Sequence, residues 1–378
     1  YDVIRYIEKI PDKCIDDLKI PDVRLSRPKN LIIYDNYKKK IYYIENIYAD
    51  NKIKNYYEKY ESIKKMKQDG VNPIIFDAGD LIFSTQMLSD SIRISEEYRA
   101  SAIIKGYEKI GCDAINVGQF ELANGLAFLL ELSKSTSIPF ISANLKNAQS
   151  NELIFDPFIT IKRSGITIGV IGLTDLVPDS IPDVVVDDFI FAGQAAINKL
   201  KNDVDIIVLL VNSDRSTYQE LPSFFSGANL IFTSGSPMMT RPMMNQVEAG
   251  PFLFSSGREG RYLNQVDLFL DAKEKSLLNK SYFLEKIKFI NRRIDRYSDK
   301  DPEKKLEDLY RDQPGVLNAI NKSKAEIERM RKELEKAENW IEFQNIPMGA
   351  SIQDDSTMFS FVKDALAKCS ELKVASSP

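Results

Sequence analysis

Acidic and amide side chains follow several short apolar segments of this chain. Asp80 ends the loop D-A-G-D, which comes after the apolar run P-I-I-F. The segment V-G-Q-F-E-L-A-N-G at 117–125 comes after the next such run and contains Gln119 and Phe120. Loops that follow neighbouring parallel strands lie together at the carboxyl edge of the sheet. Carboxylate, amide and hydroxyl oxygens gathered there suit a hard cation such as Ca²⁺ or Mg²⁺.

Three further segments have the same form. Asp35 lies in Y-D-N-Y after the run L-I-I. Asn212 lies in V-N-S at the end of the strongly apolar run I-I-V-L-L-V, and Ser236 lies in T-S-G-S-P-M. Together with Asp80 and Gln119 these residues are the polar positions from which the sequence could build one site.

The chain contains no histidine. This excludes zinc hydrolase sites that use histidine, Ser–His and Cys–His nucleophile pairs, and haem sites with a histidine axial ligand. The three cysteines Cys14, Cys112 and Cys369 are far apart and odd in number, so we expect no disulfide framework and no C-x-x-C motif. We expect no haem partner.

The overall composition is that of an ordinary globular protein, with 43% hydrophobic and 28% charged residues in a chain of 378. The net charge of −4 and the pI of about 5.4 provide no basic field, so we expect no nucleic-acid partner. The chain begins at Tyr1, so a preceding signal peptide or lipid anchor stays open, and membrane contact is expected only through such an anchor.

The first half of the chain alternates apolar runs with helical patterns, which is typical of α/β layers. We expect strands at 31–34, 73–77, 114–117 and 139–144, and helices at 55–66, 93–110 and 122–134. Residues 35–54 form a polar, tyrosine-rich segment in this interpretation.

The middle of the chain favours mixed strand directions. Residues 158–173 predict a hairpin with a Ser-Gly turn, and 252–256 and 262–270 are expected to be antiparallel strands. The remaining expected elements are strands at 205–211 and 229–235 and helices at 190–201 and 215–225. The sequence therefore predicts an α/β (α+β) domain over 30–290, in which two mixed sheets pack face to face between helices in four layers.

The ends of the chain differ from this domain. Residues 1–29, broken by three prolines, predict an N-terminal arm, and 347–378 predict a short helix at 356–369 with a polar tail. Residues 301–346 predict a long charged helix that Pro314 opens.

The long helix carries a coiled-coil-like seam. The seam residues are Ile320, Ile327, Met330, Leu334, Ala337 and Ile341. Two interpretations stay open: the helix docks on its own domain, because three heptads are marginal for a free coil, or it is a partner-binding arm. Trp340 is expected to pack on this helix.

In order and spacing, the strand-end loops resemble those of the calcineurin-like metallophosphoesterases. The similarity is to the catalytic domain of the bacterial 5′-nucleotidase and 2′,3′-cyclic phosphodiesterase group, and it covers roughly residues 30–270. The segments S-A-N at 142–144, G-V-I-G-L at 169–173 and G-R-E-G-R-Y-L at 257–263 support it. The resemblance implies an extracytoplasmic setting, in the periplasm or at the cell surface.

In that family the loops hold two divalent metals, which activate a water and neutralise charge on the phosphoryl oxygens. The resemblance places Asp35 and Asp80 at family carboxylates, Asp80 at the metal-bridging one. It places Tyr37 at the first-loop histidine, Gln119 at an asparagine ligand and Phe120 at the catalytic histidine.

The later loops depart from the family in the same way. Asn212 stands at the fourth-loop histidine, and Ser236 and Met238 stand at the two histidines of the last loop. A phenylalanine offers neither a lone pair nor a proton, so Phe120 cannot do acid–base work. We therefore expect no catalytic residue, no bound cofactor, and Phe120 and Met238 filling the metal space. The vestigial metal-site positions are Asp35, Asp80, Gln119, Asn212 and Ser236; a single Ca²⁺ or Mg²⁺ is the alternative.

These expectations leave three functions open. The first is a non-catalytic scaffold or binding module that contacts a protein partner, or a second copy, through the long helix and the N-terminal arm. The second is a pseudoenzyme that holds a nucleotide or anion, with Gly118, Gly235, Arg258 and Arg261 as contacts. The third is a divalent-metal phosphoesterase with a histidine-free site of oxygen ligands.

Overall fold

The computed structural model describes residues 60–177, 181–235, 238–244, 250–257, 262–271, 276–348 and 356–375, together with the backbone of two N-terminal strands. Tyr37, Ser236, Arg258 and Arg261 lie outside the described residues, as does the predicted arm at 1–29. The chain divides into two compact units, residues 1–50 and 51–378.

The first unit contains a strand pair. β1 (Asn30–Asp35) contains the strand predicted at 31–34, and it pairs antiparallel with β2 (Lys40–Glu45). The β2 segment lies in the stretch that was predicted only as polar and tyrosine-rich, and the strand there was not predicted. K-I-Y-Y-I-E is rich in aromatic and β-branched residues, which favour a pleated strand.

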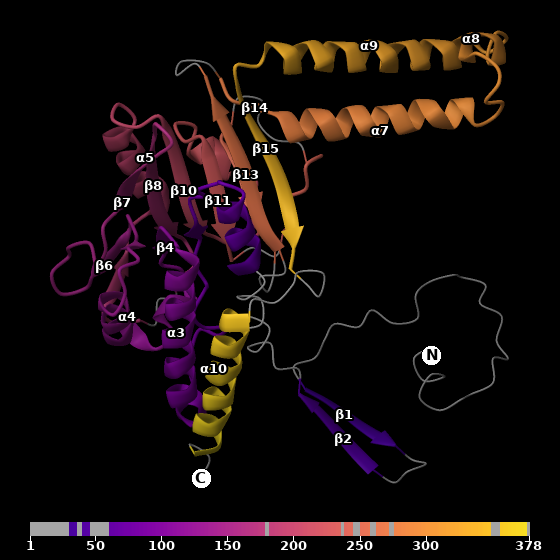
Figure 1. Ribbon diagram of the computed structural model, residues 1–378. Helices are drawn as coiled ribbons and strands as arrows, with labels where there is room; N and C mark the ends of the chain where they lie inside the picture. Colours follow the sequence, from indigo (N-terminus) through magenta and orange to yellow (C-terminus); the bar gives the residue numbers. More distant parts are fainter. Residues whose placement is uncertain are drawn as a thin grey trace. The chain divides into compact units, whose positions relative to one another are not determined.

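The second unit begins with a helical stretch at 60–68 and a small parallel sheet. The sheet order is β3 (Phe76–Asp77), β4 (Ala114–Asn116), β5 (Phe140–Ile141). Three helices cover one face of it: α3 (Asp90–Ile110), α4 (Gly125–Lys134) and α10 (Ser356–Ala375). Figure 1 shows α3 and α10 side by side, and their apolar residues share one core with those of α4.

The larger sheet has five strands. In order they are β12 (Phe252–Ser255), β11 (Leu230–Ser234), β10 (Ile206–Asn212), β8 (Ile166–Thr174) and β7 (Phe158–Arg163). The predicted 158–173 hairpin is confirmed as β7 and β8, with Ser164 and Gly165 at φ +52° and +82° in the turn. The expectation that 252–256 is antiparallel is wrong, because β12 runs parallel to β11.

Helices α5 (Phe189–Leu200) and α6 (Leu221–Phe224) cover the outer face of the five-stranded sheet. Its inner face, with Val208 and Leu210, shares an apolar core with Ile141 of the small sheet and with Phe343. Two short strands, β6 (Leu145–Asn147) and β9 (Val184–Val186), pair beside it. The predicted arrangement of packed sheets between helices is thus confirmed.

Phe343 belongs to a third sheet, with the order β13 (Tyr262–Leu270), β15 (Asn339–Pro347), β14 (Leu278–Asn279). Between β14 and β15 the chain forms α7 (Lys280–Ser298), α8 (Leu306–Leu309) and α9 (Pro314–Lys336). Figure 1 shows α7 and α9 side by side as a helical hairpin.

The helix predicted within 301–346 is therefore shorter. It begins at Pro314 as expected and ends at Lys336, whereas Trp340 and Ile341 lie in β15. Alternate residues of N-W-I-E-F are buried, which is the pattern of a strand. Ile341 is one of these buried residues, and it also lies seven residues after Leu334, which made it resemble a position of the helix seam. The seam packs on the chain itself, since Ile327 and Met330 contact Ile290 of α7.

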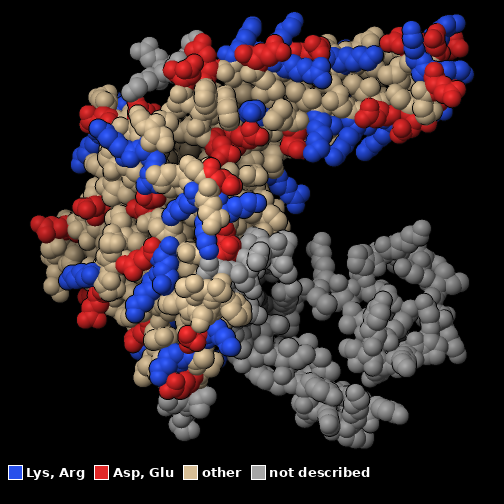
Figure 2. All heavy atoms as spheres, in the orientation of Figure 1, with Lys and Arg blue, Asp and Glu red and all other residues tan. Residues whose placement is uncertain are grey.

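The outer sides of the α7–α9 hairpin are charged. Figure 2 shows acidic and basic side chains interspersed along it. Lys286 of α7 pairs with Glu326 of α9 at 2.9 Å, which ties the two helices together beside their apolar seam. In the part of the chain that the structure describes, no helix has both the length and the apolar composition to cross a membrane.

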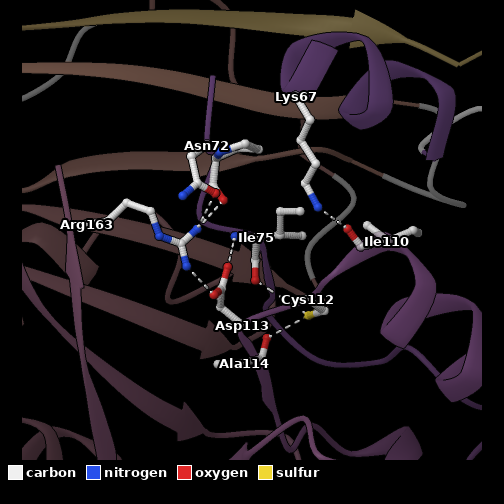
Figure 3. A network of polar contacts seen from close by, with 9 residues as sticks. Lys67, Asn72, Ile75, Ile110, Cys112, Asp113, Ala114 and Arg163 are labelled. Atoms are coloured by element: carbon white, nitrogen blue, oxygen red, sulfur yellow. Dashed lines mark hydrogen bonds and ion pairs between the residues drawn. The ribbon is translucent and has the colours of Figure 1, made fainter. Parts of the chain in front are cut away.

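A polar network holds the two main sheets together at the end where β3 and β4 begin (Figure 3). Arg163, at the end of β7, donates to Asp113 Oδ1 at 2.8 Å and to the Pro73 carbonyl at 2.6 Å. Asp113 Oδ2 in turn accepts from the Ile75 N–H at 2.8 Å. The carboxyl ends of the strands, at the opposite edge, carry the candidate site.

Candidate functional site

Loops from the carboxyl ends of β3, β4 and β10 converge on Gly118. A Cβ placed on Gly118 would lie 2.8 Å from Asp80 Oδ1 and 2.9 Å from Asn212 Cγ. The loop that contains Asp80 needs unusual backbone, with φ of +102° at Gly79 and +62° at Asp80. The structure therefore brings Asp80, Gln119 and Asn212 together, as the strand-end pattern predicted.

Glu121 anchors two of these loops, although no role was predicted for it. Its side chain is fully buried and accepts hydrogen bonds from the N–H groups of Asp80 at 2.8 Å, Leu81 at 2.5 Å, Ile82 at 3.2 Å and Gly118 at 2.8 Å. The carboxylate thus ties the β3 loop to the β4 loop. Its position three residues after a strand-end glycine is the signal that could have identified it.

The electrostatics of Glu121 follow from this burial. Burial raises the pKa of Glu121 to about 7, and the neighbouring Asp80 carboxylate acts in the same direction. The hydrogen bonds from the N–H groups of Asp80 and Ile82 lower the pKa and oppose that shift.

Phe120 takes part through its backbone. Its N–H donates to Asp80 Oδ1 at 3.2 Å, while its ring packs against the core under α3 and α4. Met238 packs against a different core, the one under α5. Phe120 and Met238 thus each extend a different apolar core.

The two amide side chains of the site are engaged with protein groups. Asn212 is fully buried, and its Oδ1 accepts from the Gln119 N–H at 3.0 Å and from Thr174 Oγ1 at 3.1 Å. Its Nδ2 donates to Ser234 Oγ at 2.8 Å. The side chain of Gln119 accepts at Oε1 from Gln86 Nε2 at 2.9 Å.

The described donor set does not fit a pair of divalent metals. Such a pair needs several anionic or imidazole ligands that face one point. Among the described residues, no group of three or more His, Cys, Asp or Glu side chains is arranged in that way. Asp80 and Glu121 are carboxylates at the convergence, but the Glu121 oxygens accept backbone N–H groups, and Asp35 belongs to the first unit.

The glycines proposed as anion contacts have close protein neighbours. The Gly118 N–H donates to Glu121 Oε2, so it is already engaged. Gly235 has φ of +81°, and a Cβ there would lie 2.7 Å from the Ser213 carbonyl oxygen, so this turn lies tightly against the end of β10.

Comparison with known proteins gives related sequences over part of the chain. No family model matches it. "Protein UshA" of Salmonella pullorum is 32% identical over 111 residues, which are 29% of this chain and 19% of that protein. The 5′-nucleotidase of Vibrio cholerae is 32% identical over 94 residues, 25% of this chain and 17% of that one. The chain thus matches less than a fifth of the length of these curated relatives.

Solved structures share the fold over most of the chain. The 5′-nucleotidase precursor of Thermus thermophilus superposes with a TM-score of 0.56 at 15% identity, over 92% of this chain and 56% of the other. The calcineurin-like phosphoesterase YfkN of Bacillus subtilis gives 0.55 at 15% identity, over 84% and 90%. The chain is therefore similar to 5′-nucleotidases in sequence over part of its length, and it shares the fold of 5′-nucleotidases and calcineurin-like phosphoesterases over most of it.

Proposed function

We propose that this chain is a non-catalytic member of the calcineurin-like metallophosphoesterase superfamily that acts as a scaffold or binding module. One observation carries the proposal: at the described metal and catalytic positions of the family, Asp80, Gln119, Phe120 and Asn212 bond to protein atoms. Asn212 and Gln119 use their amide oxygens for protein donors, and Phe120 offers the site only a backbone N–H. An extracytoplasmic setting is part of the same proposal and rests on the superfamily resemblance.

The α7–α9 hairpin is the contact element that we propose, together with the N-terminal arm. β13 and β15 pair antiparallel without a break from Tyr262↔Pro347 to Leu270↔Asn339. A β-hairpin of this kind usually closes with about two to five residues. Here the connection also contains β14, which pairs parallel with β15 and so needs a crossover of about a dozen residues or more. The two long helices α7 and α9, of 19 and 23 residues, make this crossover much longer than the sheet requires.

The charge and shape of this hairpin suit a protein partner or a second copy of the chain. Its apolar seam is closed internally by Ile290, Ile327 and Met330, and its outer sides carry charges of both signs. Phe289 of α7 is half exposed on that outer side, beside the exposed Arg292 and Arg296. Aromatic and arginine side chains are enriched at protein interfaces.

The first experiment tests catalysis directly. The purified chain is soaked in Mn²⁺, Zn²⁺, Ca²⁺ or Mg²⁺, its metal content is measured by mass spectrometry, and hydrolysis of 5′-nucleotides and 2′,3′-cyclic nucleotides is assayed. We expect substoichiometric metal and no turnover above the buffer. Tightly bound metal with turnover, both lost in Asp80→Asn, would instead establish a histidine-free phosphoesterase.

A thermal-shift titration separates binding from the scaffold role. Ligand that binds the folded state raises the free energy of unfolding by RT ln(1 + [L]/Kd). We expect no shift with nucleotides or phosphate. A saturable shift without hydrolysis would favour the pseudoenzyme that holds a nucleotide or anion.

The contact role is tested by shortening the hairpin. Arg293 Nη2 donates to Ser323 Oγ at 2.7 Å, so these residues face each other across it. Replacing 294–322 by a short Gly-Ser linker, together with Phe289→Ala, keeps the inner seam and removes the outer half and the exposed aromatic side chain. We expect the melting temperature to stay within a few degrees and partner binding or self-association to be lost. A shortened chain that keeps its associations would contradict the contact role.

A further inference from the structure

Fully buried asparagine side chains bridge the two main sheets at the ends of their strands. Asn116, the last residue of β4, donates from Nδ2 to the Leu173 carbonyl of β8 at 2.9 Å and to the Ala78 carbonyl at 3.0 Å. Asn144, just after β5, accepts from the Thr174 N–H at 3.0 Å and donates to the Thr174 carbonyl at 2.7 Å. Each side chain therefore joins the small sheet to the five-stranded sheet.

Asn212 makes the bridge in the opposite direction. It comes from β10 of the five-stranded sheet and accepts from the Gln119 N–H of the β4 loop at 3.0 Å. Its Nδ2 bonds Ser234, whose Oγ donates to the Ala78 carbonyl of the β3 loop at 2.7 Å. The Ala78 carbonyl thus accepts from Asn116 and Ser234, one residue from each sheet.

The backbones are close at this edge as well. The Ala143 N–H donates to the Gly172 carbonyl at 2.7 Å. A Cβ on Gly172 would lie 2.6 Å from Asn116 Oδ1 and 2.6 Å from the Ile141 carbonyl oxygen. The strand ends of the two sheets are therefore in direct contact through neutral groups.

Neutral amides have a property here that carboxylate ligands lack. An amide side chain can both donate and accept, so Asn144 and Asn212 satisfy donors and acceptors of the protein without a counter-ion, and Asn116 satisfies two carbonyl groups through its Nδ2. A cation at Asn212 would have to replace donors that its Oδ1 already accepts from. Each buried N–H or O–H freed in that way would be left without an acceptor, which destabilises the folded state.

We propose that this amide bridge, made of Asn116, Asn144, Asn212 and Ser234, fastens the two sheets at their strand ends without a metal ion. In the superfamily pattern, metal ions join ligands from these same loops. In this chain hydrogen bonds across the sheets join these loops instead, so folding is independent of divalent metal. The inference concerns stability, and it does not depend on the absence of hydrolysis.

Thermal unfolding tests the bridge on the intact chain. The melting temperature of the unsubstituted protein is expected to change by less than about 1 °C between EDTA and millimolar Mn²⁺, Ca²⁺ or Mg²⁺. Asn212→Ala is expected to lower it by about 5 °C, because several buried hydrogen bonds across the sheets are lost.

Asn229→Ala is the matched control. Asn229 Oδ1 accepts from the Ile207 N–H at 2.8 Å at the other end of β10, within one sheet. We expect Asn229→Ala to lower the melting temperature by about half as much as Asn212→Ala does. Equal losses in the two variants would overturn the bridge, and so would a rise of several degrees with metal in the unsubstituted chain. The metal comparison needs no variant, so it stands even where Asn212→Ala does not fold.

The outcome is separable from the proposed function. Turnover of a phosphoester with no metal-dependent change in melting temperature would defeat the non-catalytic proposal and support the bridge. Strong stabilisation by metal without turnover would contradict the amide bridge and leave the non-catalytic proposal intact.

Discussion

At the scale of single residues, the loop V-G-Q-F-E-L-A-N-G is fixed by Gly118 and Glu121, which contact neighbouring loops, while its side-chain chemistry differs from the family pattern. Gly118 remains because Asp80 and Asn212 crowd its α-carbon. Glu121 remains because it accepts N–H groups from two loops. Phe120 has no such constraint, since its ring extends an apolar core outside the polar convergence.

Gly118→Ala tests the close approach at that point. A methyl group would meet Asp80 Oδ1 at 2.8 Å and the Asp80 backbone nitrogen at 2.9 Å, so the β3 loop would have to move. We expect a loss of about 1–3 kcal/mol in the free energy of unfolding, measured by urea titration. Gly125→Ala is the control: Gly125 has φ of +82° but open space around it, so its cost is limited to about 1–2 kcal/mol of backbone strain. A smaller cost at Gly118 than at Gly125 would contradict the crowding.

Glu121 predicts a pH dependence of stability. Its folded pKa is raised from 4.5 to about 7, so the folded state binds this proton more tightly than the unfolded state does. Stability from this group is therefore greatest below the unfolded pKa, falls as the pH rises from about 4.5 to 7, and is level above that range. Glu121→Gln removes the titration. The difference in free energy of unfolding between Glu121→Gln and the unsubstituted chain, measured across this range, is expected to grow in favour of Gln as the pH rises. A constant difference would contradict the prediction.

Sequence reasoning reached these residues unevenly. Asp80, Gln119 and Asn212 were predicted to meet because each follows an apolar strand, and local pattern alone carries that information. The roles of Glu121 and Asn212 could not be predicted. Their hydrogen-bond partners lie far along the chain, 41 residues apart for Asp80–Glu121 and 93 for Gln119–Asn212, so they depend on how the sheets pack. The destinations of Phe120 and Met238 depend on the same packing.

At the scale of elements, the chain shows how one periodic pattern can cross a boundary. Ile320 and Ile327 belong to α9, while Ile341 continues their seven-residue spacing inside β15. The helix ends at Lys336 because the residues after it alternate between buried and exposed and pair with β13. Trp340 stacks on Phe269 of β13 with ring centroids 5.3 Å apart, and Lys280 lies 4.2 Å from the Trp340 ring centroid.

Alanine substitutions distinguish the strand from the seam. Ile341 is fully buried between the sheets, so Ile341→Ala is expected to cost about 2–5 kcal/mol of stability. Leu334 is half-buried near the end of α9. Leu334→Ala is therefore expected to lower the free energy of unfolding by less than about 1.5 kcal/mol. Denaturant unfolding measures both. A larger cost at Leu334 than at Ile341 would favour the continuous heptad seam over the observed strand.

At the scale of the second unit, the two main sheets are joined at both ends of their strands by different chemistry. Where β3 and β4 begin, Arg163 pairs with Asp113 at 2.8 Å. At the carboxyl ends, the amide bridge joins the sheets through neutral groups, with Asn212 fully buried. The apolar core, including Val208 and Leu210, lies between these two polar edges.

This arrangement predicts how substitutions combine. Asp113 and Asn212 lie at opposite ends of the strands and bond to different partners, so Asp113→Ala and Asn212→Ala are expected to add within about 0.5 kcal/mol in the double variant. Asn212→Ala and Ser234→Ala remove the two ends of a single 2.8 Å hydrogen bond, so that pair is expected to deviate from additivity by about 0.5–3 kcal/mol. Urea unfolding of both double-mutant cycles gives the comparison. Strong coupling between Asp113 and Asn212 would mean that the sheets separate as one cooperative step, because loosening one edge would then already release the other.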